Sequence, residues 1–274
     1  MRRLFRFVFG LLLFVAVAAL LFKGRYGGTL VPFPDRSTPP LLKDAKLELV
    51  ATLDVAPGNI AVAPDGRIFF TFHPEGRPSG TKLAELVNGQ PLPFPNAEMQ
   101  TLKSGTPSFD TPLGVRIDSQ GWLWTIDHGM HGLRTPRLLA FDIKTRALVH
   151  QYDFPGDVAG KGSFLQDLSV DPLGRYVYIA DAGIMAKRPA LIVYDSVDKV
   201  AFRRLERHTS VMDKEYLVNA KGHPLILVGG LFNVHVPVDS IAVDRKGEGA
   251  LELAAAHVIL ATGARARSLP GLEA

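Results

Sequence analysis

The sequence contains no cysteine among its 274 residues. This absence excludes disulfide bonds, thiolate nucleophiles and zinc sites with cysteine ligands. It also leaves the redox compartment of the protein open, so export has to be judged from the N-terminus.

Motifs for nucleotide chemistry and surplus positive charge are also missing from most of the chain. We find no phosphate loop, dinucleotide fingerprint or nucleophile elbow. The formal net charge is +4, but five basic and no acidic side chains lie in residues 1–28, which leaves 26 basic and 27 acidic side chains elsewhere. No aromatic residues alternate with a basic patch, so we expect no nucleic-acid partner.

An uninterrupted apolar run of 16 residues, Phe7–Phe22, follows Arg2, Arg3 and Arg6. As a helix it would be about 24 Å long, slightly short for a membrane span but longer than most signal-peptide cores. Cleavage after Ala18 would leave Leu20 to Phe22 at the new N-terminus, which favours an uncleaved anchor over a signal peptide. A twin-arginine export signal is a third alternative.

These features predict four segments. Residues 1–28 form a signal or membrane anchor, and residues 29–45, rich in proline, form a linker. Residues 46–247 form the folded domain, and residues 248–274 form a divergent tail. We expect the domain to be extracytoplasmic, periplasmic or secreted, and anchored to the membrane by residues 7–22.

A repeated unit of strand, Asp-containing turn, Gly and second strand occurs four times. The four copies begin at Asn59, Gly114, Asp167 and Asp239, and their turn aspartates are Asp65, Asp118, Asp171 and Asp244. The aspartates are 53, 53 and 73 residues apart, which indicates radial repetition with loop insertions. Outer hairpins follow in 137–154 and 190–202. The sequence therefore predicts an all-β, incomplete propeller of about three to four blades, with a closing strand at 46–54.

Three segments carry a family resemblance. Gly121-Trp-Leu-Trp-Thr-Ile-Asp, Leu138-Leu-Ala-Phe-Asp and Ser163-Phe-Leu-Gln-Asp resemble the yellow / major royal jelly protein family. This resemblance implies a six-bladed type of propeller that binds, and in some members isomerises, small aromatic or indolic compounds, as in dopachrome conversion. The likeness ends after Gly247.

A more distant likeness is to calcium-dependent lactonases of the gluconolactonase type. It implies axial metal ligands at the starts of the innermost strands. Asp239 matches the acidic position, whereas Asn59 and Gly114 stand where Glu and Asn are expected. No cofactor follows with certainty, and Ca²⁺ bound by Asp167 and Asp239 is the one metal site that we consider.

Strand order sorts the polar residues between the two ends of the blades. Residues that start innermost strands or follow second strands should meet at one mouth of the channel, and the turn aspartates should lie at the opposite one. The ligand-binding candidates at the mouth are Asn59, His73, Asp167, Asp181 and Asp239. For Asp167 and Asp239, the alternative is a carboxylate that caps backbone amides.

His128 and His131 are the catalytic candidates, because imidazoles of near-neutral pKa can act as acid or base in a tautomerisation. The alternative is a polar loop with two exposed imidazoles. Trp122 and Trp124 alternate with apolar residues, which favours core packing. Three functions stay open: a yellow-type protein with a small-molecule ligand, a metal-dependent lactonase, and a non-catalytic or truncated product.

Overall fold

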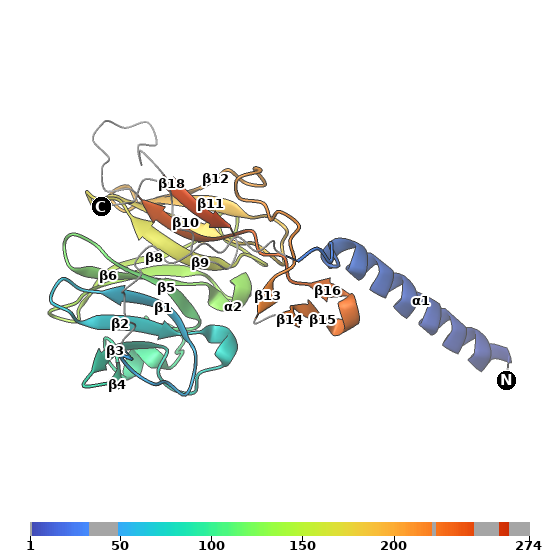
Figure 1. Ribbon diagram of the computed structural model, residues 1–274, viewed down its shortest axis with the longest axis horizontal. Helices are drawn as coiled ribbons and strands as arrows, with labels where there is room; N and C mark the ends of the chain where they lie inside the picture. Colours follow the sequence, from blue (N-terminus) through green and yellow to red (C-terminus); the bar gives the residue numbers. More distant parts are fainter. Residues whose placement is uncertain (1, 33–48, 221–222, 244–257, 263–274) are drawn as a thin grey trace, which may run out of the picture. The chain divides into compact units, whose positions relative to one another are not determined.

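The computed structural model describes residues 2–32, 49–220, 223–243 and 258–262 (Figure 1). The chain divides into two compact units. The blade unit comprises residues 42–212 and 237–262, and the N-terminal unit comprises residues 1–41, 213–236 and 263–274.

The blade unit holds three antiparallel sheets, each of four strands in sequence order. The first blade comprises β1 (Pro57–Val62), β2 (Ile68–Phe72), β3 (Leu83–Val87) and β4 (Gln90–Pro93). The second comprises β5 (Pro112–Ile117), β6 (Trp122–Asp127), β7 (Arg137–Asp142) and β8 (Leu148–Asp153). The third comprises β9 (Leu165–Val170), β10 (Tyr176–Asp181), β11 (Ala190–Asp195) and β12 (Val200–Arg204).

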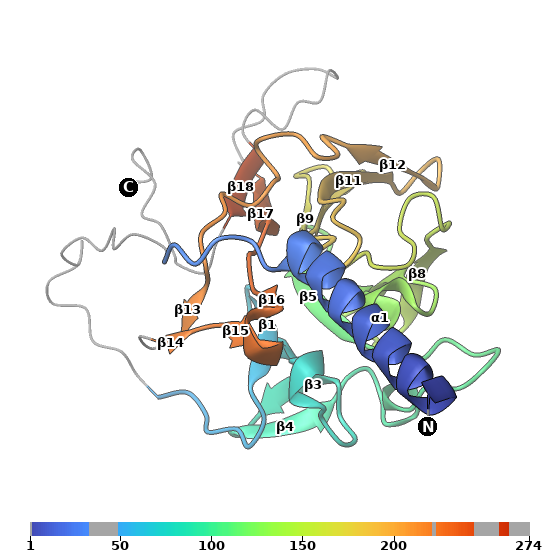
Figure 2. The same ribbon diagram turned by 90° about the vertical axis from the view of Figure 1, so that its right-hand side faces the viewer.

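A fourth sheet is formed by β17 (Val238–Val243) and β18 (Val258–Thr262), which pair antiparallel. The innermost strands β1, β5, β9 and β17 are neighbours in that order. Figure 2 shows the first blade below, the third above and β5 between them. The predicted all-β, propeller-type architecture with three complete blades and the start of a fourth is therefore confirmed.

Apolar side chains fill the spaces between neighbouring blades. Trp124, Ile126 and Leu138 of the second blade pack with Leu168 and Ile179 of the third. Another cluster joins the first and second blades, and a third joins the third blade to β17. Trp124 is fully buried, as its alternation with apolar neighbours predicts.

The turn aspartates hold the tight turns between the first two strands of each blade. The Asp118 carboxylate accepts hydrogen bonds from the amides of Gln120 (2.8 Å) and Trp122 (3.0 Å) and from the Trp124 indole (2.7 Å). Asp171 accepts from the amides of Leu173 and Tyr176, and Asp65 accepts from that of Arg67. Asp244 lies outside the described residues.

The N-terminal unit begins with α1 (Arg2–Tyr26), which is long and apolar enough to cross a membrane. Its last turns contact β16 (Phe232–Asn233), where the rings of Phe22 and Tyr26 pack against Phe232. The other strands are β13 (Asn219–Ala220), β14 (His223–Pro224) and β15 (Ile226–Leu227). The α1 helix is therefore compatible with either a signal peptide or a membrane anchor.

Several boundaries differ from those expected. Residues 213–236 belong to the N-terminal unit, since their two-residue strands pair among themselves and extend no blade. Residues 49–54 form no strand, and 46–48 lie outside the described residues, as does most of the linker. Within the linker, Pro32 forms a bridge to Leu217. Most of the expected tail is likewise undescribed, but residues 258–262 within it form β18.

Candidate functional site

The strand register separates the two ends of each blade. Pro112 pairs with Asp127 at one end of the β5–β6 pair and Ile117 pairs with Leu123 near its turn. In the third blade, Leu165 pairs with Asp181 and Val170 pairs with Val177. The starts of innermost strands and the ends of second strands therefore share one end of each blade, which we call the mouth.

Asn59 and Asp167 meet at the mouth although β5 separates their strands. The Asn59 side-chain Nδ2 donates to Asp167 Oδ1 at 3.0 Å. On β5 between them stands Gly114, where an added Cβ would lie 2.9 Å from the Gln166 carbonyl oxygen and 3.0 Å from Asp167 Cα. The lack of a side chain at Gly114 therefore lets β5 pack closely against the backbone of β9.

Asp167 and Asp239 form a pair of like charges at the mouth. Asp167 is 8% exposed and also accepts the amides of Leu168 (2.8 Å) and Ile241 (3.4 Å). Burial, and secondly the charge of Asp167, raises the pKa of Asp239 to about 6. Burial also raises the pKa of Asp167, although its hydrogen bonds and the positive charge of Arg116 act to lower it. Among the described residues, no basic side chain forms an ion pair with either carboxylate.

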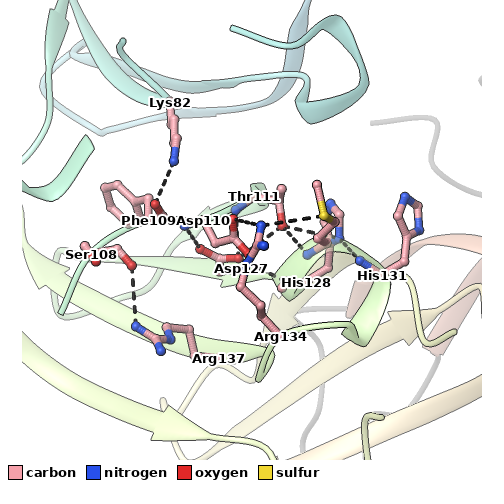
Figure 3. A network of polar contacts seen from close by, with 12 residues as sticks. Lys82, Ser108, Phe109, Asp110, Thr111, Asp127, His128, His131, Arg134 and Arg137 are labelled. Atoms are coloured by element: carbon pink, nitrogen blue, oxygen red, sulfur yellow. Dashed lines mark hydrogen bonds and ion pairs between the residues drawn. The ribbon is translucent and has the colours of Figure 1, made fainter. Parts of the chain in front are cut away.

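The second blade builds its share of the mouth around Asp127, the last residue of β6. This fully buried carboxylate accepts the amides of Asp110 (2.6 Å), Thr111 (2.9 Å) and Gly129 (3.1 Å) (Figure 3). The short helix α2 (Gly129–Gly132) follows, with Met130 and His131 in the left-handed region at φ of 50° and 56°. Asp127 thus fixes the turn that presents the histidines.

His128 is 1% exposed and is the N-cap residue of α2. Its Nδ1 accepts the His131 backbone N–H at 3.0 Å, and its buried Nε2 has no hydrogen-bond partner among the described residues. Burial, and next the neighbouring His131, lowers the pKa of His128 to about 3. The ring is therefore neutral at physiological pH.

His131 completes a cluster of aromatic rings. Its Nε2 lies 2.8 Å from Glu75 Oε1, and its buried Nδ1 has no hydrogen-bond partner in the described part of the chain. The His128 and His131 ring centroids are 4.9 Å apart, and Phe164 lies 4.9 Å from the first ring and 4.2 Å from the second. Three rings from two blades therefore line one part of the mouth.

His73 lies nearby, at the start of η1 (Pro74–Gly76). Its Nδ1 accepts the Glu75 amide at 3.2 Å, and burial lowers its pKa. It lies close enough to His128 to contribute to the low pKa of that ring. A Cβ on Gly58, beside Asn59, would lie 3.4 Å from His73 Cα, which places the first-blade residues together.

Asp181 has a different environment from the one expected of a ligand-binding residue. Its fully buried carboxylate accepts the amides of Phe164 (2.7 Å) and Gly183 (2.9 Å) and pairs with Arg203 at 2.7 Å. It occupies the same place in the third blade as Asp127 does in the second. Because these backbone amides and Arg203 already occupy its carboxylate oxygens, Asp181 is not part of the proposed binding site.

Three features of this end of the blades were missed by sequence reasoning. Glu75 and Phe164 contact the histidines but lie in loops that precede or follow the recognisable strands. Asp127 belongs to the polar cluster 127–131 that the sequence singles out, but its role in holding backbone amides was not predicted, although the blade repeat aligns it with Asp181. A cavity of about 670 Å³ opens beside Asp110, Arg134 and Arg137, where Arg134 makes a bidentate ion pair with Asp110 at 2.5 and 2.6 Å.

No group of three or more His, Cys, Asp or Glu side chains that could hold a metal ion occurs among the described residues. Asp167 and Asp239 would need amide, carbonyl or water oxygens to complete a Ca²⁺ site. Gly114 offers no side-chain oxygen to such a site.

Comparisons with known proteins identify relatives for the middle of the chain. Residues 111–237 match the family model "Major royal jelly protein". Major royal jelly protein 6 of Apis mellifera is 31% identical over 140 residues, which cover 47% of this chain and 30% of the bee protein. Major royal jelly protein 1 of the same species is 36% identical over 117 residues, covering 37% and 26%. The matches therefore span less than a third of the length of these two relatives.

Solved structures with some likeness include two enzymes. One is the gluconolactonase XC5397 from Xanthomonas campestris, with 16% identity, a TM-score of 0.38 and coverage of 76% of this chain and 54% of that one. The other is the PQQ-bound aldose sugar dehydrogenase from Streptomyces coelicolor, with 13% identity, a TM-score of 0.37 and coverage of 54% and 47%. The sequence matches are the more specific finding: in residues 111–237, which include β5 to β12, this chain resembles the major royal jelly protein family.

Proposed function

We propose that the blade unit is a binding module for a small cationic compound, a protonated aromatic amine, held at the mouth by Asp167, Asp239 and Asn59. One observation carries this proposal: the buried Asp167 carboxylate lies close enough to the half-buried Asp239 for its charge to raise the pKa of Asp239, and neither has an ion-paired base among the described residues. The resemblance to the yellow / major royal jelly proteins, some of which bind small aromatic amines, agrees with it.

Electrostatics favours a cation here. The raised pKa of Asp239 reflects the free-energy cost of ionising this carboxyl group in a partly buried site beside Asp167. An ammonium group offers three N–H donors and one positive charge, so it would relieve the repulsion and satisfy carboxylate oxygens together. The Phe164 ring and the two imidazoles supply a surface on which an aromatic part can pack.

The protonation state of His128 argues for binding rather than isomerisation. With a pKa near 3, His128 is not a proton donor at neutral pH. His131, paired with Glu75, is the remaining candidate base. An isomerase activity would therefore depend on His131 alone, without a matched acid from His128.

The lactonase alternative has less support. It requires a hard cation bound at the start of the innermost strands, where Gly114 replaces a ligand side chain and Asn59 directs its Nδ2 at Asp167. Calcium remains a useful probe, because Ca²⁺ and an ammonium ion would compete for the same carboxylates.

The α1 helix supports a location outside the cytoplasm. Because arginines precede the apolar segment, the positive-inside rule places its N-terminus in the cytoplasm and the blades on the opposite side. The ligand would then be one found in the periplasm or outside the cell.

The test is calorimetric titration of the full chain in detergent with 2-phenylethylamine, a minimal aromatic amine. We expect Asp167→Asn and Asp239→Asn each to weaken binding by about tenfold or more, since each removes one charge from the ammonium site. Asp157→Asn, on an exposed loop, is the matched control and should not change affinity. Binding that is unaffected by both mouth substitutions, or tight Ca²⁺ binding without amine binding, would refute the proposal.

A further inference from the structure

The second blade carries a cavity of about 670 Å³ on its outer strands, and none of the residues proposed to hold the amine lines it. One side of the cavity is the loop of residues 102–107, and the other is formed where β7 begins and β8 ends. Arg137 and Asp153 pair at that end of the two strands. Pockets of about 300–1,000 Å³ are typical of small-molecule sites, so this cavity has the size of one.

The loop beside the cavity is held in place by Ser108, which is 1% exposed. The Ser108 Oγ accepts the Lys103 amide at 3.0 Å and lies 3.3 Å from the carbonyl oxygens of Lys103 and Thr106. Gly105 turns the chain with a φ of 77°, in the left-handed region. The hydrogen bonds of the loop itself therefore fix this side of the cavity.

Charged side chains of both signs line the cavity, and the positive ones are in excess. The basic residues are Lys103, Arg134 and Arg137, and the acidic ones are Asp110 and Asp153. Arg134 and Asp110 form the bidentate ion pair described above, so their charges compensate each other. Lys103, Arg137 and Asp153 remain, and together they leave one positive charge for a ligand.

Arg137 uses few of its five N–H donors within the described part of the chain. Its Nη1 lies 3.4 Å from the Ser108 carbonyl oxygen (Figure 3), and its Nε lies 3.7 Å from Asp153 Oδ1. Both distances exceed the roughly 2.7–2.9 Å of a strong charge-assisted hydrogen bond. The side chain is 21% exposed, so a ligand can reach it. A carboxylate is the group that matches the planar fork of a guanidinium.

A monoanion suits the cavity better than a phosphate dianion. A dianion would exceed the single positive charge and would meet Asp153 as a like charge. The cavity also has residues with hydroxyl or amide side chains, which can exchange hydrogen bonds with hydroxyl groups of a ligand. These residues are Ser104, Thr106, Thr135 and Gln151.

We propose that this cavity is a second binding site, for a sugar acid whose carboxylate pairs with Arg137 and whose hydroxyl groups contact the polar residues of the lining. The site goes beyond the proposed amine site, because it uses neither Asp167 nor Asp239. Lys103 adds a positive charge at the exposed side of the cavity.

The test compares three probes by ligand-observed NMR titration of the full chain in detergent. Methyl β-D-glucuronide should bind about tenfold or more tightly than methyl β-D-glucoside, which has a CH₂OH group in place of the carboxylate. Cyclohexanecarboxylate keeps the ring and the carboxylate but lacks the hydroxyl groups, and it should bind about tenfold more weakly than the glucuronide. Equal affinity of the glucuronide and either analogue would overturn the inference.

Two variants identify the cations. Arg137→Gln should weaken glucuronide binding by about tenfold or more and remove the preference over the glucoside. Lys103→Gln should weaken it by about two- to fivefold, as expected for an exposed charge, and this exposed position keeps the test valid if Arg137→Gln does not fold. Lys144→Gln, in the exposed turn between β7 and β8, is the matched control and should not change the affinity. Unchanged glucuronide affinity in the folded cavity variants would overturn the inference.

Competition experiments separate this site from the amine site. Saturating 2-phenylethylamine should leave the glucuronide affinity within about twofold, and displacement of the glucuronide would place it at the mouth and overturn the inference. If the amine does not bind at all, the proposed function fails while the glucuronide titrations still decide the second site. Inorganic phosphate should bind more weakly than the glucuronide, and tighter phosphate binding would show a general anion site that does not recognise hydroxyl groups.

Discussion

Asn59 on β1 donates a 3.0 Å hydrogen bond to Asp167 on β9, across the intervening strand β5. The contact connects the first and third blades, which makes the candidate site a property of the assembled blade unit. On β5, Gly114 allows a close approach to the backbone of β9 at Asp167.

Gly114→Ala should therefore destabilise the blade unit. The new methyl group would meet the Gln166 carbonyl oxygen at 2.9 Å and Asp167 Cα at 3.0 Å, and both must shift. We expect a loss of about 1–3 kcal/mol in the free energy of unfolding, as for other overpacked positions, measured by urea denaturation. Gly156→Ala is the control, because a Cβ there meets nothing within 4 Å. Equal stability of the two variants would show that the close approach at Gly114 is tolerated.

Asp118→Ala should destabilise the second blade more than Asp65→Ala destabilises the first. Asp118 accepts two backbone amides and the indole N–H of the fully buried Trp124, whereas Asp65 accepts one exposed amide. Loss of the indole acceptor should cost about 1–3 kcal/mol, and the Asp65 change about 0.5 kcal/mol or less. Thermal unfolding of both variants provides the comparison, and equal shifts in Tm would contradict this role for Asp118.

Asp239→Asn should stabilise the unliganded protein at neutral pH. The folded-state pKa of Asp239 is raised from 3.8 to about 6, so its ionisation opposes folding. This penalty is absent well below pH 3.8, grows between pH 3.8 and 6, and is constant above that range. We expect a gain of about 1–3 kcal/mol at pH 7.5, and little gain at pH 4, from urea denaturation at the two pH values. A loss of stability at pH 7.5 would mean that Asp239 is a structural capping residue.

The α1 helix should keep the full chain in the membrane fraction through carbonate washing. Its 25 residues are long and apolar enough to span a bilayer. Replacing Leu11 and Leu12 by Lys should release the chain, because each charge is costly at the bilayer centre. N-terminal sequencing distinguishes the alternative: a soluble mature protein that begins near Ala19 would show that the segment is a cleaved signal peptide.

The blade repeat could be predicted because short local sequence patterns specify it. Each Asp–Gly turn, such as that at Asp118, lies between two short apolar strands, and both turn chemistry and alternation act over a few residues. Strand order alone then places Asn59, Asp167 and Asp239 at one end of the blades. The register of β5 with β6 and of β9 with β10 shows this end to be opposite the turns.

The details of the site could not be predicted because they depend on loops and on contacts between blades. The pairing of Glu75 with His131 spans 56 residues of sequence and two blades, and no local pattern specifies it. His128 is buried and packs against Phe164, which comes from the loop before β9. Asp181 has the same spacing as a mouth residue, yet Arg203 and two backbone amides occupy its carboxylate. The family resemblance indicated a propeller type of fold but specified none of these contacts.

Amine binding by the carboxylate pair is tested most directly by the affinity for 2-phenylethylamine between pH 5 and pH 8. The amine stays protonated throughout this range, whereas the Asp239 carboxylate gains a proton as the pH falls through about 6. If the carboxylate pair binds the ammonium group, affinity should fall about tenfold from pH 7.5 to pH 5, with a midpoint near pH 6, and Asp239→Asn should remove this dependence. An affinity that is constant over the range, or that rises as the pH falls, would contradict amine binding by Asp167 and Asp239.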